Sequence, residues 1–349
     1  MKQIKIKKFI DCVLPIETCN LKCHYCCITI DRKSDKKIPD FSSQANLIGK
    51  ALSIEKLGGP CLINICGFGE TMLSKDLITF VENLLKAGHY VMIVTNGTVT
   101  KRFKEIALLN PKLLKNLFFK FSFHYLELKR TKQMKSFFDN INLIKNLGCS
   151  YSVELTPNDE IISEIDNIKD ICMNNIGAVC HLTVTRDGKK DGLPLLTKLS
   201  SKEYKKIWKT FKSPMFDYKF SIFGKKIKKY CYAGLWTLFL NLGTGELKQC
   251  YQGNYISQNI YKEIEIPFKF YPIAKNCPEP HCYNAHAFLT FGAVPQMHAP
   301  TYLKMRDRKT KDGQVWINDN FKMIFSQKLK ENNKEISFLQ KIFHRGHNQ

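Results

Sequence analysis

The sequence contains no apolar run of the roughly 20 residues that a membrane-spanning helix needs. Its amino-terminal segment, MKQIKIKKFIDCVL, is basic and then apolar. The apolar part is short, is interrupted by Asp11 and lacks a small-residue cleavage site, so it does not resemble a signal peptide. No internal repeat is evident beyond an alternation of strand and helix patterns. These absences argue against a membrane-spanning or secreted protein, and we expect a cytosolic one.

Acidic residues are scarce relative to basic ones. The chain of 349 residues has 54 Lys and Arg against 31 Asp and Glu, and its net charge of +23 is spread along the sequence. Such a charge favours acidic partners, namely nucleic acid, phosphorylated compounds or an anionic membrane surface, although a lysine-rich solvated surface is the simpler explanation. Because lysine clusters interleaved with aromatics are few, 223–230 (FGKKIKKY) being the best, we do not expect a nucleic-acid partner.

Disulfides are not expected, although the chain has 14 cysteines. In a reducing compartment, cysteine clusters indicate metal or catalytic sites instead of a disulfide framework. Isolated cysteines in apolar, periodic segments are better explained as buried free thiols, and this group comprises Cys61, Cys66, Cys149, Cys172 and Cys180.

Short apolar runs alternate with amphipathic segments over roughly the first 190 residues. The pattern predicts strands over 9–16, 61–66, 90–97, 117–125, 150–155 and 178–186, and helices over 76–88, 101–109, 133–148 and 158–175. The strands are continuously apolar, as buried parallel strands are. Six such units predict an α/β fold with a parallel sheet, open or closed like a partial TIM barrel, whose chemistry lies at the carboxyl ends of the strands.

Four cysteines lie within nine residues directly after the first predicted strand, in IETCNLKCHYCCITI (16–30). Three of them have the spacing Cys19-x3-Cys23-x2-Cys26. A structural zinc site is the simplest alternative, but it usually has paired C-x2-C knuckles that supply four ligands, and no partner pair is close by. Three thiolates suit a 4Fe–4S cluster whose fourth iron stays open for a further ligand.

This loop resembles that of the radical S-adenosylmethionine (SAM) enzymes, whose hallmark is CxxxCxxC after the first barrel strand, with an aromatic such as Tyr25 before the third cysteine. The resemblance covers roughly the first 190 residues and implies a partial (β/α)6 barrel. It implies that Cys19, Cys23 and Cys26 hold a 4Fe–4S cluster that binds SAM. One electron, from a flavodoxin- or ferredoxin-type donor, would then cleave SAM to a 5′-deoxyadenosyl radical that abstracts hydrogen from a substrate. By analogy Cys27 is not a ligand, and we expect a packed thiol there.

A second motif, GFGET (67–71), follows the second predicted strand and resembles the GGE or GxGE motif of the same family. The resemblance implies that Gly67, Gly69 and Glu70 meet the amino group of the SAM methionine. The motif departs from the family pattern by having Phe68 in place of a glycine and Thr71 where proline is frequent.

Further polar residues stand at the ends of later predicted strands. For each, a structural role remains an alternative to contact with SAM or substrate. By resemblance we expect Thr95 and Asn96 at the cofactor and His124 and Glu154 in catalysis, with contacts to ribose, carboxylate or substrate from Ser122 and Arg186.

A second group of cysteines comprises Cys231, Cys250, Cys277 and Cys282. The stretch CYAGLWTLFLNLGTGELKQC, in which we also expect a hairpin turning at 243–245, resembles the start of the SPASM or twitch extensions that hold auxiliary 4Fe–4S clusters. Four cysteines, where a full SPASM domain has seven or more, favour one twitch-like cluster. The alternative is a structural zinc site formed by the same four thiolates, in which His281 or His286 could replace one ligand.

The predicted domains are 1–195, a radical SAM core; 196–300, a twitch- or SPASM-like auxiliary domain; and 301–349, a basic helical tail with a helix over 318–333. The first boundary is marked by the Gly-, Pro- and charge-rich DGKKDGLP (187–194). In the tail, Arg306 and Arg308 flank Asp307 in a charged stretch. We expect an exposed solvated loop there, with bidentate binding of a phosphate or carboxylate as the alternative.

The resemblance implies an oxidoreductase that modifies a C–H bond. Members with such extensions modify ribosomal peptides, mature other proteins, or dehydrogenate or epimerise sugars and aminocyclitols. Only about ten residues precede the first predicted strand, so we expect no fused peptide-recognition domain. With the basic charge, this favours a small-molecule or glycan substrate, such as a nucleotide-linked or phosphorylated sugar. A peptide or protein substrate, RNA modification and a non-catalytic zinc protein remain alternatives.

Overall fold

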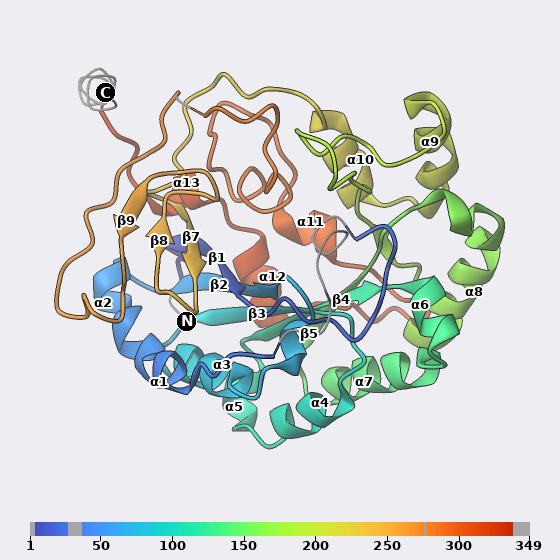
Figure 1. Ribbon diagram of the computed structural model, residues 1–349, viewed down its shortest axis with the longest axis horizontal. Coiled ribbons are helices and arrows are strands. Elements are labelled where there is room, and N and C mark those ends of the chain that lie inside the picture. The colour runs from blue at the N-terminus through green and yellow to red at the C-terminus, as the bar shows by residue number, and fades with distance from the viewer. Residues whose placement is uncertain (1–3, 27–36, 276, 338–349) are drawn as a thin grey trace.

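The computed structural model describes residues 4–26, 37–275 and 277–337, so Cys27 lies outside the described residues. Within them the strands form one sheet in the order β6-β5-β4-β3-β2-β1-β7-β8-β9 (Figure 1). The strands are β1 (Lys8–Leu14), β2 (Cys61–Gly67), β3 (Tyr90–Thr95), β4 (Leu117–Phe123), β5 (Ser150–Leu155), β6 (His181–Leu182), β7 (Thr237–Asn241), β8 (Leu247–Lys248) and β9 (Tyr255–Ser257).

The sheet is parallel from β6 through β1 to β7 and is not closed. Only the hairpin β7–β8 and its extension to β9 are antiparallel. This confirms the predicted α/β class with an open partial barrel. The sixth strand is much shorter than the predicted 178–186, because β6 lies at the edge of the sheet and the chain then turns so that Arg186 pairs with Leu195.

Helices follow most of the strands and lie along the outside of the curved sheet (Figure 1). No helix in the described ranges is long and apolar enough to cross a membrane. The helices are α1 (Ser42–Ala51), α2 (Ile54–Leu57), α3 (Leu77–Lys86), α4 (Thr100–Ile106), α5 (Pro111–Leu114), α6 (Tyr125–Arg130), α7 (Met134–Asn146), α8 (Ile165–Ile176), α9 (Ser201–Trp208), α10 (Pro214–Ile222), α11 (Tyr302–Arg306), α12 (Asp319–Phe325) and α13 (Leu329–Asn332), with 3-10 turns η1 (Thr71–Leu73), η2 (Asp159–Glu164) and η3 (Lys209–Phe211).

Two predicted helices are broken. The segment 158–175 begins as the 3-10 turn η2 and becomes α-helical only in α8. The segment 318–333 is divided into α12 and α13 around Gln327, whose buried side chain accepts a hydrogen bond from the Ile6 amide and donates one to the Ile4 carbonyl. The helix is therefore interrupted where the Gln327 side chain hydrogen-bonds to the backbone of Ile4 and Ile6.

The two faces of the sheet differ in chemistry. Phe119 and Phe121 of β4 contact Phe103 of α4, so this face is packed against the outer helices. Because side chains alternate along a strand, Lys120 points to the opposite, inner face. Residues in register on neighbouring strands share a face, and this places a polar layer on the inner side. Asp11, Asn64, Lys120 and Ser152 of this layer are buried, and Glu154 is half-buried.

Aromatic residues from the carboxyl-terminal region cover the inner face of the sheet at the amino ends of its strands. Phe9 of β1 contacts Phe288 and Phe291, while Phe118 of β4 contacts Phe321 and Phe325. The inner side is therefore filled at the amino ends of the strands, and the loops at their carboxyl ends remain for a site.

The prediction of an exposed loop around Arg306 was wrong. Arg306 lies at the end of α11 with no exposed surface. Arg308 donates hydrogen bonds to the carbonyl oxygens of Lys212 and Phe211, at 3.0 and 3.1 Å. These contacts dock the segment against the region around β6 and η3, which charge patterning along the chain does not reveal. The three predicted domains stay a prediction.

Candidate functional site

Cys19, Cys23 and Cys26 line a cavity of about 190 Å³ at the carboxyl ends of the parallel strands. All three are free thiols and half-buried. The other walls are formed by the ends of β2, β3 and β4 and by the loops that follow them. The cavity thereby brings the cysteines together with seven residues that the sequence singled out, namely Gly67, Gly69, Glu70, Thr95, Asn96, Ser122 and His124.

The glycine-rich turn after β2 is pressed against the cysteine loop. The Gly69 amide donates to the Ile16 carbonyl at 2.5 Å, and the Glu70 amide donates to the Thr18 carbonyl at 3.0 Å. A Cβ atom on Gly69 would overlap the carbonyl oxygen of Thr18. Glycine is therefore required at 69 for close approach of the two backbones.

The buried carboxylate of Glu70 braces the wall of the cavity. Its Oε1 accepts hydrogen bonds from Met72 N (2.9 Å) and Thr95 Oγ1 (2.6 Å), and its Oε2 accepts one from Asn96 N (2.7 Å). Burial raises the pKa of this carboxyl, while the three donors act in the opposite direction. A carboxylate has about four acceptor positions, so one remains for an incoming amino group. Contact with the amino group of SAM stays a prediction.

Asn96 holds the cysteine loop directly. Its Nδ2 donates to Asn20 Oδ1 at 2.8 Å and lies 3.9 Å from Cys19 Sγ. Asn20 in turn donates to Thr98 Oγ1 at 2.8 Å. Sequence reasoning missed Asn20, because it occupies a variable position of the cysteine spacing.

His124 forms a buried pair with Tyr25. Its Nδ1 lies 3.0 Å from Tyr25 Oη. Burial lowers the pKa of His124 to about 4, against the opposing charge of Glu127, so the imidazole is neutral near pH 7. Glu127, which the sequence reasoning also missed, accepts a hydrogen bond from the Lys22 amide at 2.6 Å. Tyr25 is not among the residues that line the cavity, so it holds the His124 ring through this hydrogen bond from outside the cavity.

Glu154 and Arg186 do not line this cavity. Glu154 forms an ion pair with Arg306 on the inner side of the sheet. Arg186 donates to the carbonyl oxygen of Tyr283 at 3.1 Å, and Tyr283 lines a second cavity. The structure therefore places both predicted residues outside the lining of the first cavity, Glu154 beside Arg306 and Arg186 beside Tyr283.

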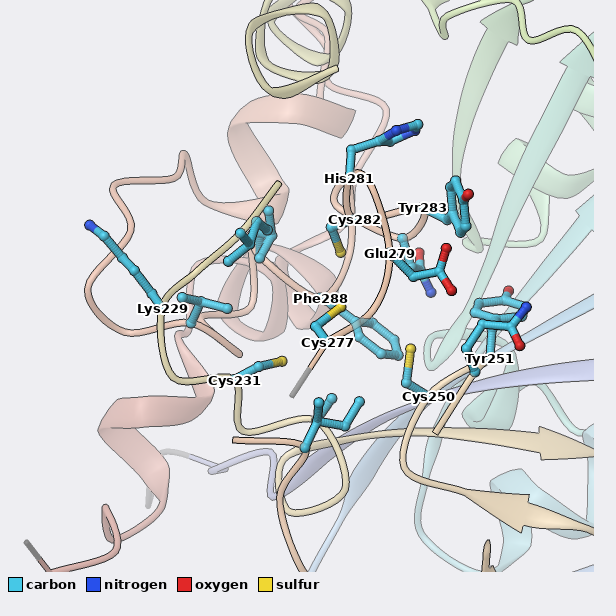
Figure 2. Close-up of a pocket in the computed structure, with 17 residues that line it drawn as sticks. Lys229, Cys231, Cys250, Tyr251, Cys277, Glu279, His281, Cys282, Tyr283 and Phe288 are labelled. Carbon is cyan, nitrogen blue, oxygen red and sulfur yellow. The ribbon is translucent and has the colours of Figure 1, made fainter. Parts of the chain in front are cut away.

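The second cavity, of about 50 Å³, is lined by all four predicted auxiliary cysteines (Figure 2). Figure 2 shows them on different sides of one space, with the ring of Phe288 beside it. The backbone of Cys231 forms an isolated antiparallel β-bridge with that of Ala274, and Cys250 follows β8. All four are free thiols. The fold thus gathers cysteines that are far apart in the sequence: Cys231, Cys250, Cys277 and Cys282.

The surroundings of these thiols are mainly apolar. Burial raises the pKa of Cys231 to about 12 and that of Cys250 to about 11. His281 also lines the cavity, and its Nε2 has no hydrogen-bond partner among the described residues. His286 does not line it. Burial lowers the pKa of His286 far below its usual value, as do the charges of Lys219 and other basic residues.

In the part of the chain that the structure describes, no three His, Cys, Asp or Glu side chains are grouped closely enough to hold a single metal ion. The cysteines of each set share a cavity instead. Thiolate sulfur is the donor that iron–sulfur clusters use, three or four per cubane. The donor set of each cavity therefore fits a cluster.

Asp11 connects the second cavity to the sheet. Its Oδ2 accepts hydrogen bonds from Tyr251 Oη and Asn284 Nδ2, both at 2.6 Å, and its Oδ1 accepts one from Asn64 Nδ2 at 2.6 Å. Tyr251 and Asn284 line the second cavity next to its cysteines. The charge of Asp11 within an apolar strand was the signal in the sequence, and its partners become evident only in the fold.

Several solved structures resemble this chain at low identity. SuiB of Streptococcus suis bound to S-adenosylmethionine is 12% identical with a TM-score of 0.49, over 75% of this chain and 66% of that one. The present chain therefore matches just under two thirds of the length of SuiB. The structure of anSMEcpe with bound AdoMet is 14% identical with a TM-score of 0.46, over 98% of this chain and 100% of that one. For BtrN in complex with AdoMet and 2-DOIA the values are 15% and 0.35, over 75% and 82%.

No curated protein matches this chain. Residues 13–171 match the family model described as the Radical SAM superfamily. This range begins within β1, includes the cysteine loop and the GFGET turn, and ends within α8. The chain therefore contains a radical SAM domain, which confirms the resemblance carried by Cys19, Cys23 and Cys26.

Proposed function

We propose that this protein is a radical SAM enzyme that abstracts hydrogen from a C–H bond of a small-molecule or glycan substrate. The observation that carries the proposal is the first cavity. In it the three cysteines of the motif face Glu70, Asn96, Ser122 and His124 within the radical SAM domain.

In this proposal Cys19, Cys23 and Cys26 hold a 4Fe–4S cluster. The cluster and SAM supply the chemistry: one electron breaks a C–S bond of SAM, giving methionine and a 5′-deoxyadenosyl radical that takes a hydrogen atom from the substrate. A flavodoxin- or ferredoxin-type protein supplies the electron.

The remaining residues bind and orient. The free acceptor position of Glu70 and the backbone at Gly67 and Gly69 receive the amino group of SAM. The Ser122 hydroxyl lines the same cavity and can hydrogen-bond to the ribose or the carboxylate. His124 is neutral and fixed by Tyr25, so it can exchange a hydrogen bond with the ligand without carrying charge.

The second cavity holds an auxiliary 4Fe–4S cluster in this proposal, bound by Cys231, Cys250, Cys277 and Cys282. The thiolates of these four residues would be its protein ligands. When bound, such a cluster would supply a one-electron acceptor for the substrate radical, which together with loss of a proton would complete a dehydrogenation. Epimerisation is the other outcome that the same first step permits.

The test is anaerobic incubation of the reconstituted protein with SAM and dithionite, followed by measurement of 5′-deoxyadenosine. We expect its formation by the wild-type protein and equally by Cys27→Ala. Absence of the product from a protein with an intact cluster would contradict the proposal. So would a colourless protein that, after anaerobic reconstitution, contains stoichiometric zinc and no iron or sulfide.

A further inference from the structure

Lys120 lies between the two cysteine cavities. It precedes Ser122 by two residues on β4, so both side chains are on the inner face. Its register partner on β3 is Val94, and Val94 and Ser122 both line the first cavity. Asp11, which is close enough to act on the charge of Lys120, is hydrogen-bonded to residues of the second cavity.

Arg306 lies in the same buried layer. Its side chain has no exposed surface, and Nη1 forms the ion pair with Oε1 of Glu154. Nε and Nη2 have no hydrogen-bond partner among the described residues. A buried guanidinium with unused donors is costly, because water no longer solvates it. The Arg306 charge also acts on Lys120, so the two cations are close to each other.

The acceptors in this layer do not satisfy its donors. Among the described residues, none accepts a hydrogen bond from the ammonium group of Lys120. Asp11 already accepts three hydrogen bonds from neutral groups, and Glu154 is engaged by one nitrogen of Arg306. The two buried cations, Lys120 and Arg306, thus have only two carboxylates near them. Glu154 is already paired with Arg306, and most acceptor positions of Asp11 are already occupied. An additional anion would satisfy this arrangement.

We propose that Lys120 and Arg306 bind an acidic group of the substrate, a carboxylate or a phosphate, in the polar layer on the inner face of the sheet, beside the first cavity. The assignment of this anion to a substrate rests on the proposed function. Arginine offers a planar pair of donors to such a group and lysine a compact charge. Glu154 then acts as a positioning residue: it holds Arg306 in place when the acidic group is absent and competes with that group for the guanidinium.

Anion binding can be measured without knowing the substrate. The probes are sulfate, as a stand-in for a phosphate, and acetate, as a stand-in for a carboxylate, added to the anaerobic reconstituted protein at constant ionic strength against chloride. We expect at least one of them to raise the Tm more than chloride does. The stronger of the two identifies the acidic group as phosphate-like or carboxylate-like.

Two variants should change binding in opposite directions. Lys120→Met should weaken binding of the effective anion by about tenfold, the value of a lost charged hydrogen bond. Glu154→Gln should strengthen it, because the guanidinium of Arg306 is released. Lys104→Met, an exposed lysine on α4, is the control and should leave binding unchanged. A merely structural role of these residues does not produce opposite signs in anion affinity.

SAM also carries a carboxylate, so its own binding must be measured in the same variants. We expect unchanged SAM affinity in Lys120→Met and an anion effect that persists when SAM is saturating. If Lys120→Met weakens SAM binding and saturating SAM abolishes the anion effect, the cations bind SAM and the proposal is overturned. It is also overturned if Lys120→Met binds sulfate and acetate as the wild type does. Failure to form 5′-deoxyadenosine would instead contradict the proposed function and leave this binding result intact.

Discussion

The two cysteine cavities are assembled in different ways. The first takes its three cysteines from one loop of eight residues, Cys19 to Cys26. The second takes four cysteines from segments between Cys231 and Cys282, which come together only through the hairpin β7–β8 and the loops beyond it. A local loop can be recognised by its spacing, whereas a site built from distant segments depends on the fold.

The walls of the cavities differ as well. Polar groups of Glu70, Asn96 and Ser122 surround the first, and a hydrogen-bond network holds its loop. The second is smaller, and Phe288 and other apolar side chains form much of its wall. The first is therefore suited to a polar molecule beside its cysteines. The second has little room for anything beyond what the cysteines themselves hold.

The largest effect is expected in the first cavity. Cys23→Ala removes one of only three cysteine ligands, so formation of 5′-deoxyadenosine should fall to the limit of detection. The control is Cys149→Ala, which removes a buried thiol outside both cavities and should retain activity. Residual SAM cleavage by Cys23→Ala would contradict the assignment of the three ligands.

The second cavity should behave differently. Cys282→Ala should reduce the iron content of the reconstituted protein by about half, because one of two 4Fe–4S clusters is lost. Formation of 5′-deoxyadenosine in the absence of substrate should persist, since the first cavity is intact. An unchanged iron and sulfide content would contradict the auxiliary cluster. Loss of 5′-deoxyadenosine formation together with the iron would remove the distinction between the cavities.

A third comparison lies within the first cavity. Gly69→Ala places a methyl group against the backbone of Thr18, so we expect the free energy of unfolding to fall by about 3 kcal/mol, as measured by anaerobic urea denaturation. Gly67→Ala is the matched control, because its Cβ would lie 3.3 Å from its nearest neighbours, the Gly69 carbonyl oxygen and Thr71 Oγ1. If both variants lose the same stability, close approach at Gly69 is not what holds the cysteine loop.

Much of this organisation could be predicted from the sequence. The apolar runs correctly predicted five parallel strands, and the cysteine loop and the GFGET turn meet in one cavity as their positions after β1 and β2 required. Spacing along the chain carries this information, because parallel strands end at the same edge of the sheet.

The remaining features depend on contacts between distant segments. The hairpin at 243–245 was predicted, but the pairing of β7 with β1 joins residues more than 200 positions apart. Arg306 was expected in solvent and is buried against Glu154, because α11 packs inside the molecule. Lys120 within the apolar run LFFKFSF was a visible signal, and its meaning depends on these same contacts.

The smallest predicted effect concerns Lys120, between the two cavities. Burial and the charge of Arg306 lower its pKa to about 7, while Asp11 and Cys66 act in the opposite direction. Raising the pH from about 6 to about 8.5 should therefore neutralise Lys120 and weaken sulfate binding several-fold, since sulfate itself does not titrate in this range. Without anion, the stability should rise as the pH increases above about 7, because the unfolded chain then binds more protons at this lysine than the folded chain does. Lys120→Arg, which stays charged, should bind sulfate with the same affinity at both pH values. A pH dependence in Lys120→Arg equal to that of the wild type would assign the titration to another group and separate Lys120 from the anion.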